Sequence, residues 1–247
     1  MIQFLSIAYR NMKTVGTICP SSPMLSRELA ESAITATSPK RVLEVGPGTG
    51  PVTKEILKSL RDGDVLDIVE LSTEFCTDLQ AKVIGPWKSK GRPGQVTLHN
   101  AAIQDVPLEA GSYDCVVCGL PFNNFEHELV ETIMLRLLDL LRPGGELSYF
   151  CYFGAKTVKS TVLDGAGRDN LRAIARLEDE LHLAHSGTRR VVLANFPPAE
   201  VRRPHRASPA SSATVGRPST RRPIECRASP SASRRRRAGP SLGSKMN

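Results

Sequence analysis

Short apolar runs alternate along the chain with longer segments in which apolar residues recur every three or four positions. The short runs predict β-strands over Arg41–Val45, Val65–Val69, Val96–His99, Tyr113–Cys118, Glu146–Tyr152 and Arg190–Asn195. The longer segments predict α-helices over Pro23–Thr35, Val52–Leu60, Glu74–Ile84, Phe125–Leu141 and Asp169–His185. Strands and helices that alternate at this spacing form a mostly parallel sheet with helices on both faces. The pattern therefore predicts an α/β fold.

The first predicted strand runs directly into a glycine-rich turn. Gly46, Gly48 and Gly50 are spaced by two, and the next predicted helix begins at once. Positions without a side chain let the backbone turn sharply and approach a bound ligand closely. The second predicted strand is followed by Glu70, whose carboxylate is well placed to accept hydrogen bonds from ribose hydroxyls.

Two details distinguish this turn from a turn that binds a nicotinamide dinucleotide. The glycine pattern is GxGxG followed by Pro51, instead of GxGxxG, and an acidic residue, Glu44, precedes the first glycine by two positions. This spacing suits a nucleoside that lies over the strand ends better than a pyrophosphate on a helix N-terminus. The alternative is a glycine-rich turn in some other α/β domain.

The E-x-G-x-G-x-G pattern and the acidic strand end resemble the cofactor site of class I S-adenosylmethionine-dependent methyltransferases, which have a Rossmann-like fold. The resemblance implies that Gly46, Gly48 and Gly50, with Glu44, surround the methionyl part of the cofactor. It also implies that Glu70 and Leu71 hold the ribose and that adenine lies beside Asn100, Ala101 and Ala102. Relatives often have an acidic residue at position 101 to receive the adenine amino group. Here a backbone group, Gln104 or Asp105 must accept the hydrogen bond from the adenine amino group.

Four segments together look like the bacterial phospholipid N-methyltransferase family, over about residues 4 to 201: Val15–Ser22, Val42–Gly50, Gly119–Phe122 and Asn195–Ala199. That family is related to the rRNA adenine dimethylases and the ornithine-lipid methyltransferases. It converts phosphatidylethanolamine stepwise towards phosphatidylcholine, so the resemblance implies an N-methyltransferase that acts on phosphatidylethanolamine or a related aminolipid.

The acceptor nitrogen is expected at the end of the fourth predicted strand. By the same resemblance, Gly119, Leu120, Pro121 and Phe122 present backbone carbonyls and an aromatic wall to it. The sequence assigns no general base; the candidates are Tyr9, Tyr149, His127 and Glu126, each of which also has an ordinary structural explanation.

The methyltransferase fold ends in an antiparallel hairpin that closes the sheet. Arg190–Asn195 supplies the first strand of that hairpin, but the segment after Pro198 has only Val201 as a good strand residue and then Pro204. We therefore expect the closing strand to be missing or poorly formed.

The charge is divided very unevenly along the chain. The net charge is +8, but from Arg202 onward there are 12 basic residues and one acidic residue, whereas the rest carries 21 basic and 24 acidic residues. The domain is mildly acidic, so we do not expect it to bind nucleic acid. The segment from 202 to 247 is rich in Ser, Pro, Ala and Arg and predicts a disordered tail. Its amino-acid composition suggests an out-of-frame reading of a GC-rich gene. A native basic tail that binds acidic lipid or nucleic acid is the alternative.

The sequence divides into residues 1–40, an N-terminal helical cap, residues 41–201, the methyltransferase domain, and residues 202–247. No apolar run is long enough to span a bilayer, and the first residues do not resemble a signal peptide. Ile2–Met12 is expected to form an amphipathic helix that lies among lipid headgroups, or else an ordinary packed helix. We expect a cytoplasmic protein on the inner face of the cytoplasmic membrane, with a lipid substrate at the membrane surface and anionic phospholipid as partners.

The six cysteines are scattered, as is typical of a reducing compartment. Cys115 and Cys118 lie three apart on one predicted strand and therefore face opposite sides, so no metal site is expected.

The leading function is a membrane-associated lipid-amine N-methyltransferase that uses S-adenosylmethionine. An rRNA adenine N6-methyltransferase is the second hypothesis. The sequence disfavours it because Gly119–Phe122 replaces the Asn/Asp-Pro-Pro-Tyr/Phe motif that holds a flipped base, and because the domain shows no basic stripe. The third is an inactive remnant that binds cofactor or lipid and has lost the closing strand.

Overall fold

The computed structural model describes residues 21–152, 165–195 and 197–207. The predicted helix Ile2–Met12, Tyr9, residues 15–20, Phe196 and the chain from residue 208 onward lie outside the described residues. The helical elements are α2 (Pro23–Thr35), α3 (Pro51–Ser59), α4 (Thr73–Leu79), the π-helical turn η1 (Gln80–Ile84), α5 (Gly85–Ser89), the 3-10 turn η2 (Phe122–Asn124), α6 (His127–Leu140) and α8 (Gly165–Ala184). The strands are β1 (Arg41–Val45), β2 (Val65–Glu70), β3 (Gln95–Asn100), β4 (Tyr113–Cys118), β5 (Leu141–Tyr152), β6 (Gly187–Val192) and β7 (Ala199–Pro204).

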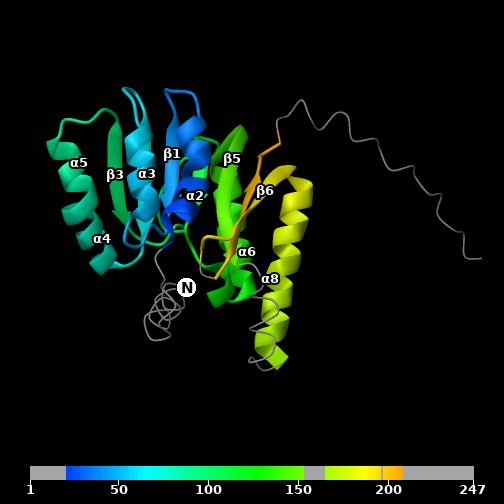
Figure 1. Cartoon of the computed structure of the whole chain (residues 1–247). Coiled ribbons are helices and arrows are strands. Elements are labelled where there is room, and N and C mark those ends of the chain that lie inside the picture. The colour runs from blue at the N-terminus through cyan, green and yellow to red at the C-terminus, as the bar shows by residue number, and fades with distance from the viewer. Residues whose placement is uncertain (1–20, 153–164, 196, 208–247) are drawn as a thin grey trace, which may run out of the picture. The chain divides into compact units, whose positions relative to one another are not determined.

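The seven strands form one sheet in the order β3-β2-β1-β4-β5-β7-β6 (Figure 1). Strands β1 to β5 are parallel, and β7 pairs antiparallel with β5 on one side and β6 on the other. The register sets Val45 opposite both Val69 and Cys118, so the carboxyl ends of β1, β2 and β4 meet at one edge. Chain order reverses at β1, the position where open α/β sheets bind ligands.

Helices cover both faces of the sheet, as the alternating pattern predicts. Side chains of successive strand residues point to opposite faces, and β1 shows the division. Val42 packs in a core with α2 and α3, whereas Leu43 packs in a second core with α6. Cys115 and Cys118 also lie in different cores, which confirms that they face opposite sides. Among the described residues, none of the helices combines the length and apolarity needed to cross a bilayer.

The sequence prediction was wrong about the closing strand, because β7 is present and pairs with a strand on each side. Tyr149 to Tyr152 pair with its residues on one side, and β6 pairs along its whole length on the other. Arg202 and Arg203, which the composition assigned to the basic tail, are buried strand residues. Their burial is possible because each has carboxylate partners on a neighbouring helix. The closing hairpin is therefore present.

Most other differences lie at element ends, apart from the π-helical turn η1 inside a predicted helix and one additional short helix. Strand β6 begins three residues earlier than predicted and ends at Val192, and β5 extends back to Leu141 through an irregularity opposite Tyr113 and Cys115. The short helix α5 was not predicted, because Gly85 and Pro86 resemble a helix stop. The helix α2 and the strands β1 and β4 have the predicted bounds. Ser22 caps α2 by accepting a hydrogen bond from the Leu25 N–H, and Pro23 occupies the first turn.

Candidate cofactor and acceptor site

The glycine turn after β1 adopts a backbone that glycine tolerates best. Gly46, Gly48 and Gly50 have φ angles of +69°, +56° and +82°, a region that side-chain-bearing residues rarely adopt. The turn is tied to the neighbouring strands, because the Gly46 N–H donates to the Val69 carbonyl at 2.9 Å and the Gly119 N–H donates to the Val45 carbonyl at 2.8 Å. The three strand ends are thus held together by backbone hydrogen bonds.

The three glycines have different neighbours. A Cβ at Gly46 would lie 2.5 Å from the Leu120 Cδ2 atom, and a Cβ at Gly50 would lie 2.6 Å from the Leu79 Cδ2 atom. Close packing within the protein accounts for Gly50, whereas Gly46 packs against Leu120 and also lines the pocket described below. A Cβ at Gly48 would meet no atom within 4 Å. Gly48 is thus the glycine of this turn with free space above its Cα atom, as a ligand-facing position requires.

Glu70 ends β2 beside this free space. The side chain is 1% exposed, and its carboxylate accepts hydrogen bonds from the Gly48 N–H at 3.2 Å and the Ser72 N–H at 2.8 Å. Asn100, at the end of β3, donates to the backbone carbonyls of Glu70 and Leu71. Asn100 therefore positions the end of β2 and the residue that follows it.

Glu44 lies one strand away and has a different environment. It is also 1% exposed, but neither carboxylate oxygen makes a hydrogen bond of ordinary geometry to the described residues. Burial raises the pKa of Glu44 to about 8, Thr53 partly offsets this, and the negative charge of Glu70 raises it further. A cation placed near Glu44 would stabilise the ionised carboxylate and so lower its pKa. The cofactor's methionyl ammonium is such a cation.

A narrow pocket at the strand ends brings together several of the residues that the sequence singled out. Gly46, Glu70, Leu71, Ala101, Ala102 and Leu120 line it, together with Val45, Val69, Ile103, Gln104, Phe125 and Ile133. The sequence analysis did not single out Ile103, Phe125 or Ile133. Phe125 is close enough to Phe122 in sequence to have been considered, whereas Ile133 is indistinguishable from any other core position of α6.

Gln104 is the pocket residue that best replaces the missing acid at position 101. Both polar atoms of its side-chain amide are buried, and neither has a hydrogen-bond partner among the described residues. Buried amides are normally satisfied, so an adenine edge is a fitting partner for this one. Asp105, the other candidate, is exposed and does not line the pocket. Of the groups without a partner, Gln104 lines this pocket and fits an adenine, while the buried carboxyl group of Glu44 and the open space at Gly48 lie at the adjoining end of β1.

The loop from Gly119 to Phe122 follows β4 on the other side of the pocket. A Cβ at Gly119 would lie 2.6 Å from the Gly46 carbonyl oxygen, so this glycine permits the close approach of the two loops. Phe122 is 2% exposed and packs edge-on against Tyr149, with ring centroids 6.1 Å apart. The accessible part of this loop is Leu120 and Pro121, which are apolar and half-buried.

The candidates for the general base that lie among the described residues differ in burial and in protonation state. Tyr149 is fully buried, and burial together with the charge of Glu178 raises the pKa of its hydroxyl, which therefore stays protonated. Glu126 is exposed at the start of α6. His127 is half-exposed, and its Nδ1 atom lies 3.2 Å from a carboxylate oxygen of Glu128. The structure thus excludes Tyr149 as the base at neutral pH and leaves Glu126 and His127 as candidates.

Comparison with known proteins agrees with this geometry. Residues 42–145 match the family model described as a methyltransferase domain. An ornithine lipid N-methyltransferase of Singulisphaera acidiphila is 28% identical over 142 residues, which are 58% of this chain and 72% of that protein.

Two solved structures share the fold. A Corynebacterium glutamicum protein has a TM-score of 0.58 and 16% identity, over 83% of this chain and 90% of that chain. Pyrococcus horikoshii TYW2, solved in complex with MeSAdo, has a TM-score of 0.50 and 15% identity, over 77% of this chain and 66% of that chain. The chain has a Rossmann-like methyltransferase fold, residues 42–145 match a methyltransferase domain, and the residues at the strand ends fit S-adenosylmethionine as the cofactor.

Proposed function

We propose that the protein transfers methyl groups from S-adenosylmethionine to the amine headgroup of a membrane lipid, phosphatidylethanolamine or a related aminolipid. The observation that carries the proposal is the similarity to an ornithine lipid N-methyltransferase, which extends over most of that protein. The apolar character of Leu120 and Pro121 supports it, because residues 119–122 carry no side-chain carboxylate or amide to hydrogen-bond the edge of a flipped base.

The protein's part in the reaction is alignment and desolvation. The bound cofactor supplies a methyl group on a sulfonium. The lipid amine must present its lone pair in line with the methyl–sulfur bond, and the backbone of Gly119 and Leu120 lies where it can orient that amine. Holding two reactants in such geometry contributes up to about 7–11 kcal/mol of barrier reduction in favourable cases. The amine enters as an ammonium and must first release a proton to solvent or to a surface base such as Glu126 or His127.

The inactive-remnant hypothesis loses its basis, because it depended on a missing closing strand and β7 is present. The rRNA hypothesis is kept as an outcome of the test. Its sequence argument is weakened in one respect, because the structure gathers basic side chains on one face of the domain.

The test is a label-transfer assay with the full chain and methyl-labelled S-adenosylmethionine. Separate reactions contain phosphatidylethanolamine vesicles, ornithine-lipid vesicles or rRNA. We expect label in mono-, di- or trimethylated lipid amines and none in RNA. Label in RNA alone overturns the proposal. The absence of label from both lipids, in protein that binds S-adenosylhomocysteine, overturns it as well.

A further inference from the structure

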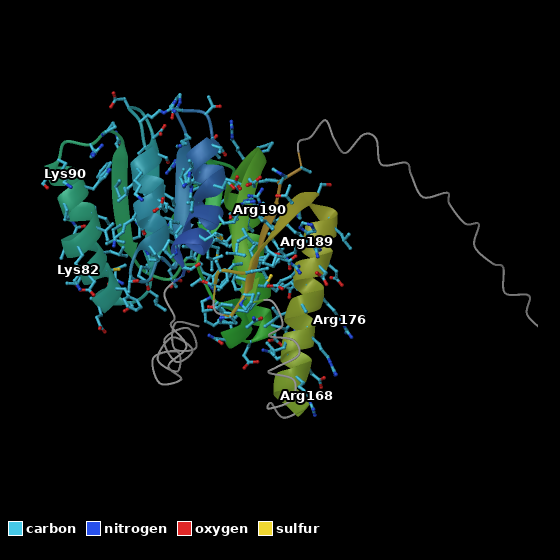
Figure 2. All side chains as sticks on the ribbon, in the orientation of Figure 1. Lys82, Lys90, Arg168, Arg176, Arg189 and Arg190 are labelled. Atoms are coloured by element: carbon cyan, nitrogen blue, oxygen red, sulfur yellow. The ribbon has the colours of Figure 1, made fainter. Side chains whose placement is uncertain are left out.

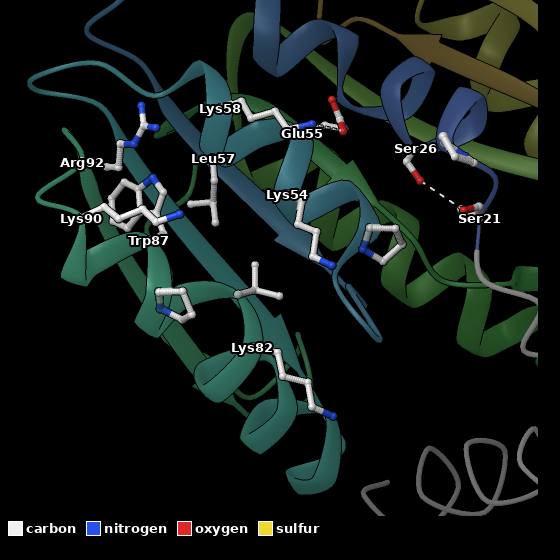
Figure 3. A pocket seen from close by; sticks show the side chains of 14 residues that line it. Ser21, Ser26, Lys54, Glu55, Leu57, Lys58, Lys82, Trp87, Lys90 and Arg92 are labelled. Carbon is white, nitrogen blue, oxygen red and sulfur yellow. Dashed lines mark hydrogen bonds and ion pairs between the residues drawn. The ribbon is translucent and has the colours of Figure 1, made fainter.

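A basic groove lies on the face of the domain that carries α2, α3, η1 and α5, outside the cofactor pocket (Figure 3). Its volume is about 500 Å³, which is within the range of small-ligand sites. Its lining includes Pro51, Lys54, Leu57, Trp87, Lys90 and Arg92. Pro51 directly follows Gly50, so one end of the groove adjoins the glycine turn.

The groove has an excess of positive charge that the composition of the domain conceals. Five cationic side chains line it, against one carboxylate, Glu55. Lys58 pairs with Glu55 at 2.6 Å, and Lys82 pairs with Asp78 at 2.8 Å. Lys54, Lys90 and Arg92 have no ion pair with any described residue. These three cations come from α3 and from the segment after α5, so they converge only in the folded chain.

The floor of the groove is apolar. Leu57 and Val83 are buried beneath it, and the half-buried indole of Trp87 lies beside Lys90 and Arg92 (Figure 3). The Nε1 atom of Trp87 is buried and has no acceptor among the described residues. Unpaired cations around an amphipathic aromatic residue suit an anionic group that is attached to apolar material.

We propose that this groove binds the headgroup of an anionic phospholipid and holds the domain on the membrane that contains its substrate. The choice of lipid over other anions rests on the proposed function and on the apolar floor. An RNA strand requires an extended basic track with several bases stacked on aromatic side chains, whereas this groove offers a single aromatic residue. Headgroup binding would bring the glycine turn, which adjoins the groove, close to the bilayer surface.

Trp87 is the only tryptophan of the chain, so intrinsic fluorescence reports on the groove directly. The experiment uses the full chain and vesicles that contain phosphatidylcholine brominated near the headgroup end of its acyl chains, with or without phosphatidylglycerol. We expect the Trp87 emission to be quenched when phosphatidylglycerol is present and to change little without it. This readout is separate from any attraction of the basic C-terminal segment to the same vesicles.

The test variant combines Lys54→Gln, Lys90→Gln and Arg92→Gln. Its control combines Arg168→Gln, Arg172→Gln and Arg176→Gln on α8, which packs against α6 on the other side of the sheet, with the same loss of charge. Figure 2 labels Arg168 and Arg176. Each basic residue near an anionic surface contributes to binding, so the groove variant should need at least about 10-fold more vesicles for half-quenching. The control should stay within about 2-fold of the unmodified protein.

Several results overturn the inference. One is vesicle binding without quenching of Trp87, and another is an equal loss of quenching in both triple variants. The third is an RNA oligonucleotide or inorganic phosphate that changes Trp87 emission at lower concentration than the lipid does. Methyl transfer to detergent-solubilised phosphatidylethanolamine is measured in parallel. Transfer without quenching removes the groove inference alone, whereas quenching without transfer removes the proposed function alone.

Discussion

Two regions of the molecule bury ionisable side chains, and the two regions differ in the partners that they provide. At the edge where β1 and β2 end, Glu44 has no hydrogen bond of ordinary geometry within the described residues. At the closing strand β7, Arg203 contacts Glu28 at 2.6 Å and Glu31 at 2.7 Å, and Arg202 contacts Asp179 at 2.9 Å. Because adjacent strand residues face opposite sides, Arg203 holds α2 and Arg202 holds α8.

The difference separates ionised groups that stabilise the fold from a buried carboxyl group that a bound cation would stabilise in its charged form. A buried ion that is fully paired is costly to disturb, because removal of one partner leaves the other uncompensated. A buried carboxylate without a partner weakens the fold and is retained where it binds something. Substitutions at β7 should therefore change stability, whereas substitutions at the glycine turn should change cofactor binding.

The largest effect is expected for Arg203→Ala. This change leaves Glu28 and Glu146 without their buried partner and should lower the free energy of unfolding by about 3–5 kcal/mol. Urea denaturation followed by circular dichroism measures it. Arg190→Ala is the matched control, because Arg190 pairs with the same Glu28 but its side chain is 63% exposed. The control should cost less than about 1 kcal/mol, and equal losses in both variants would contradict the comparison.

The next effect concerns Gly48→Ala. The new methyl group meets no protein atom but enters the space assigned to the cofactor, so we expect 10- to 100-fold weaker binding of S-adenosylhomocysteine, equivalent to about 1–3 kcal/mol of overpacking. Gly91→Ala controls for backbone strain, because Gly91 has a φ of +59° and equally open surroundings. If both variants bind S-adenosylhomocysteine equally well, Gly48 does not face the ligand.

A further effect is the pH dependence due to Glu44. Its pKa in the folded protein is about 8, above the ordinary value of 4.5, so between these values the folded state holds a proton that the unfolded chain has released. The contribution of this group to stability is complete below pH 4.5 and is lost as the pH rises through 8. The slope is on the order of 1 kcal/mol per pH unit.

Glu44→Gln should remove the loss of stability that occurs as the pH rises, and it should make the protein more stable than the unmodified chain at pH 8. Denaturation midpoints measured from pH 5 to 8 test this, with the exposed Glu131→Gln as the control. If the denaturation midpoints of all three proteins change with pH in the same way, burial does not raise the cost of ionising Glu44.

The elements that sequence alone predicted are those that local signals specify. The strand Arg41–Val45, the glycine turn and Glu70 follow from residues that lie close together in the chain, and Ser22 and Pro23 mark the start of α2. The closing strand could not be predicted, because Arg202 and Arg203 acquire carboxylate partners only from distant helices. The basic groove was missed for the same reason, since a net charge does not show where Lys54, Lys90 and Arg92 converge.

The division of the three glycines also needed the structure. In sequence they are equivalent, but Gly46 and Gly50 face Leu120 and Leu79, and only their packing separates them from Gly48. Similarly, no sequence signal marked Gln104 above Asp105 as the pocket residue.

The central claim is that S-adenosylmethionine binds at the ends of β1, β2 and β3, where buried polar atoms of Glu44 and Gln104 have no hydrogen-bond partner among the described residues. Titration calorimetry of the full chain with S-adenosylhomocysteine at pH 7 tests it most directly. The account predicts saturable binding of one molecule per chain. A folded protein that takes up no S-adenosylhomocysteine at millimolar concentration would contradict it.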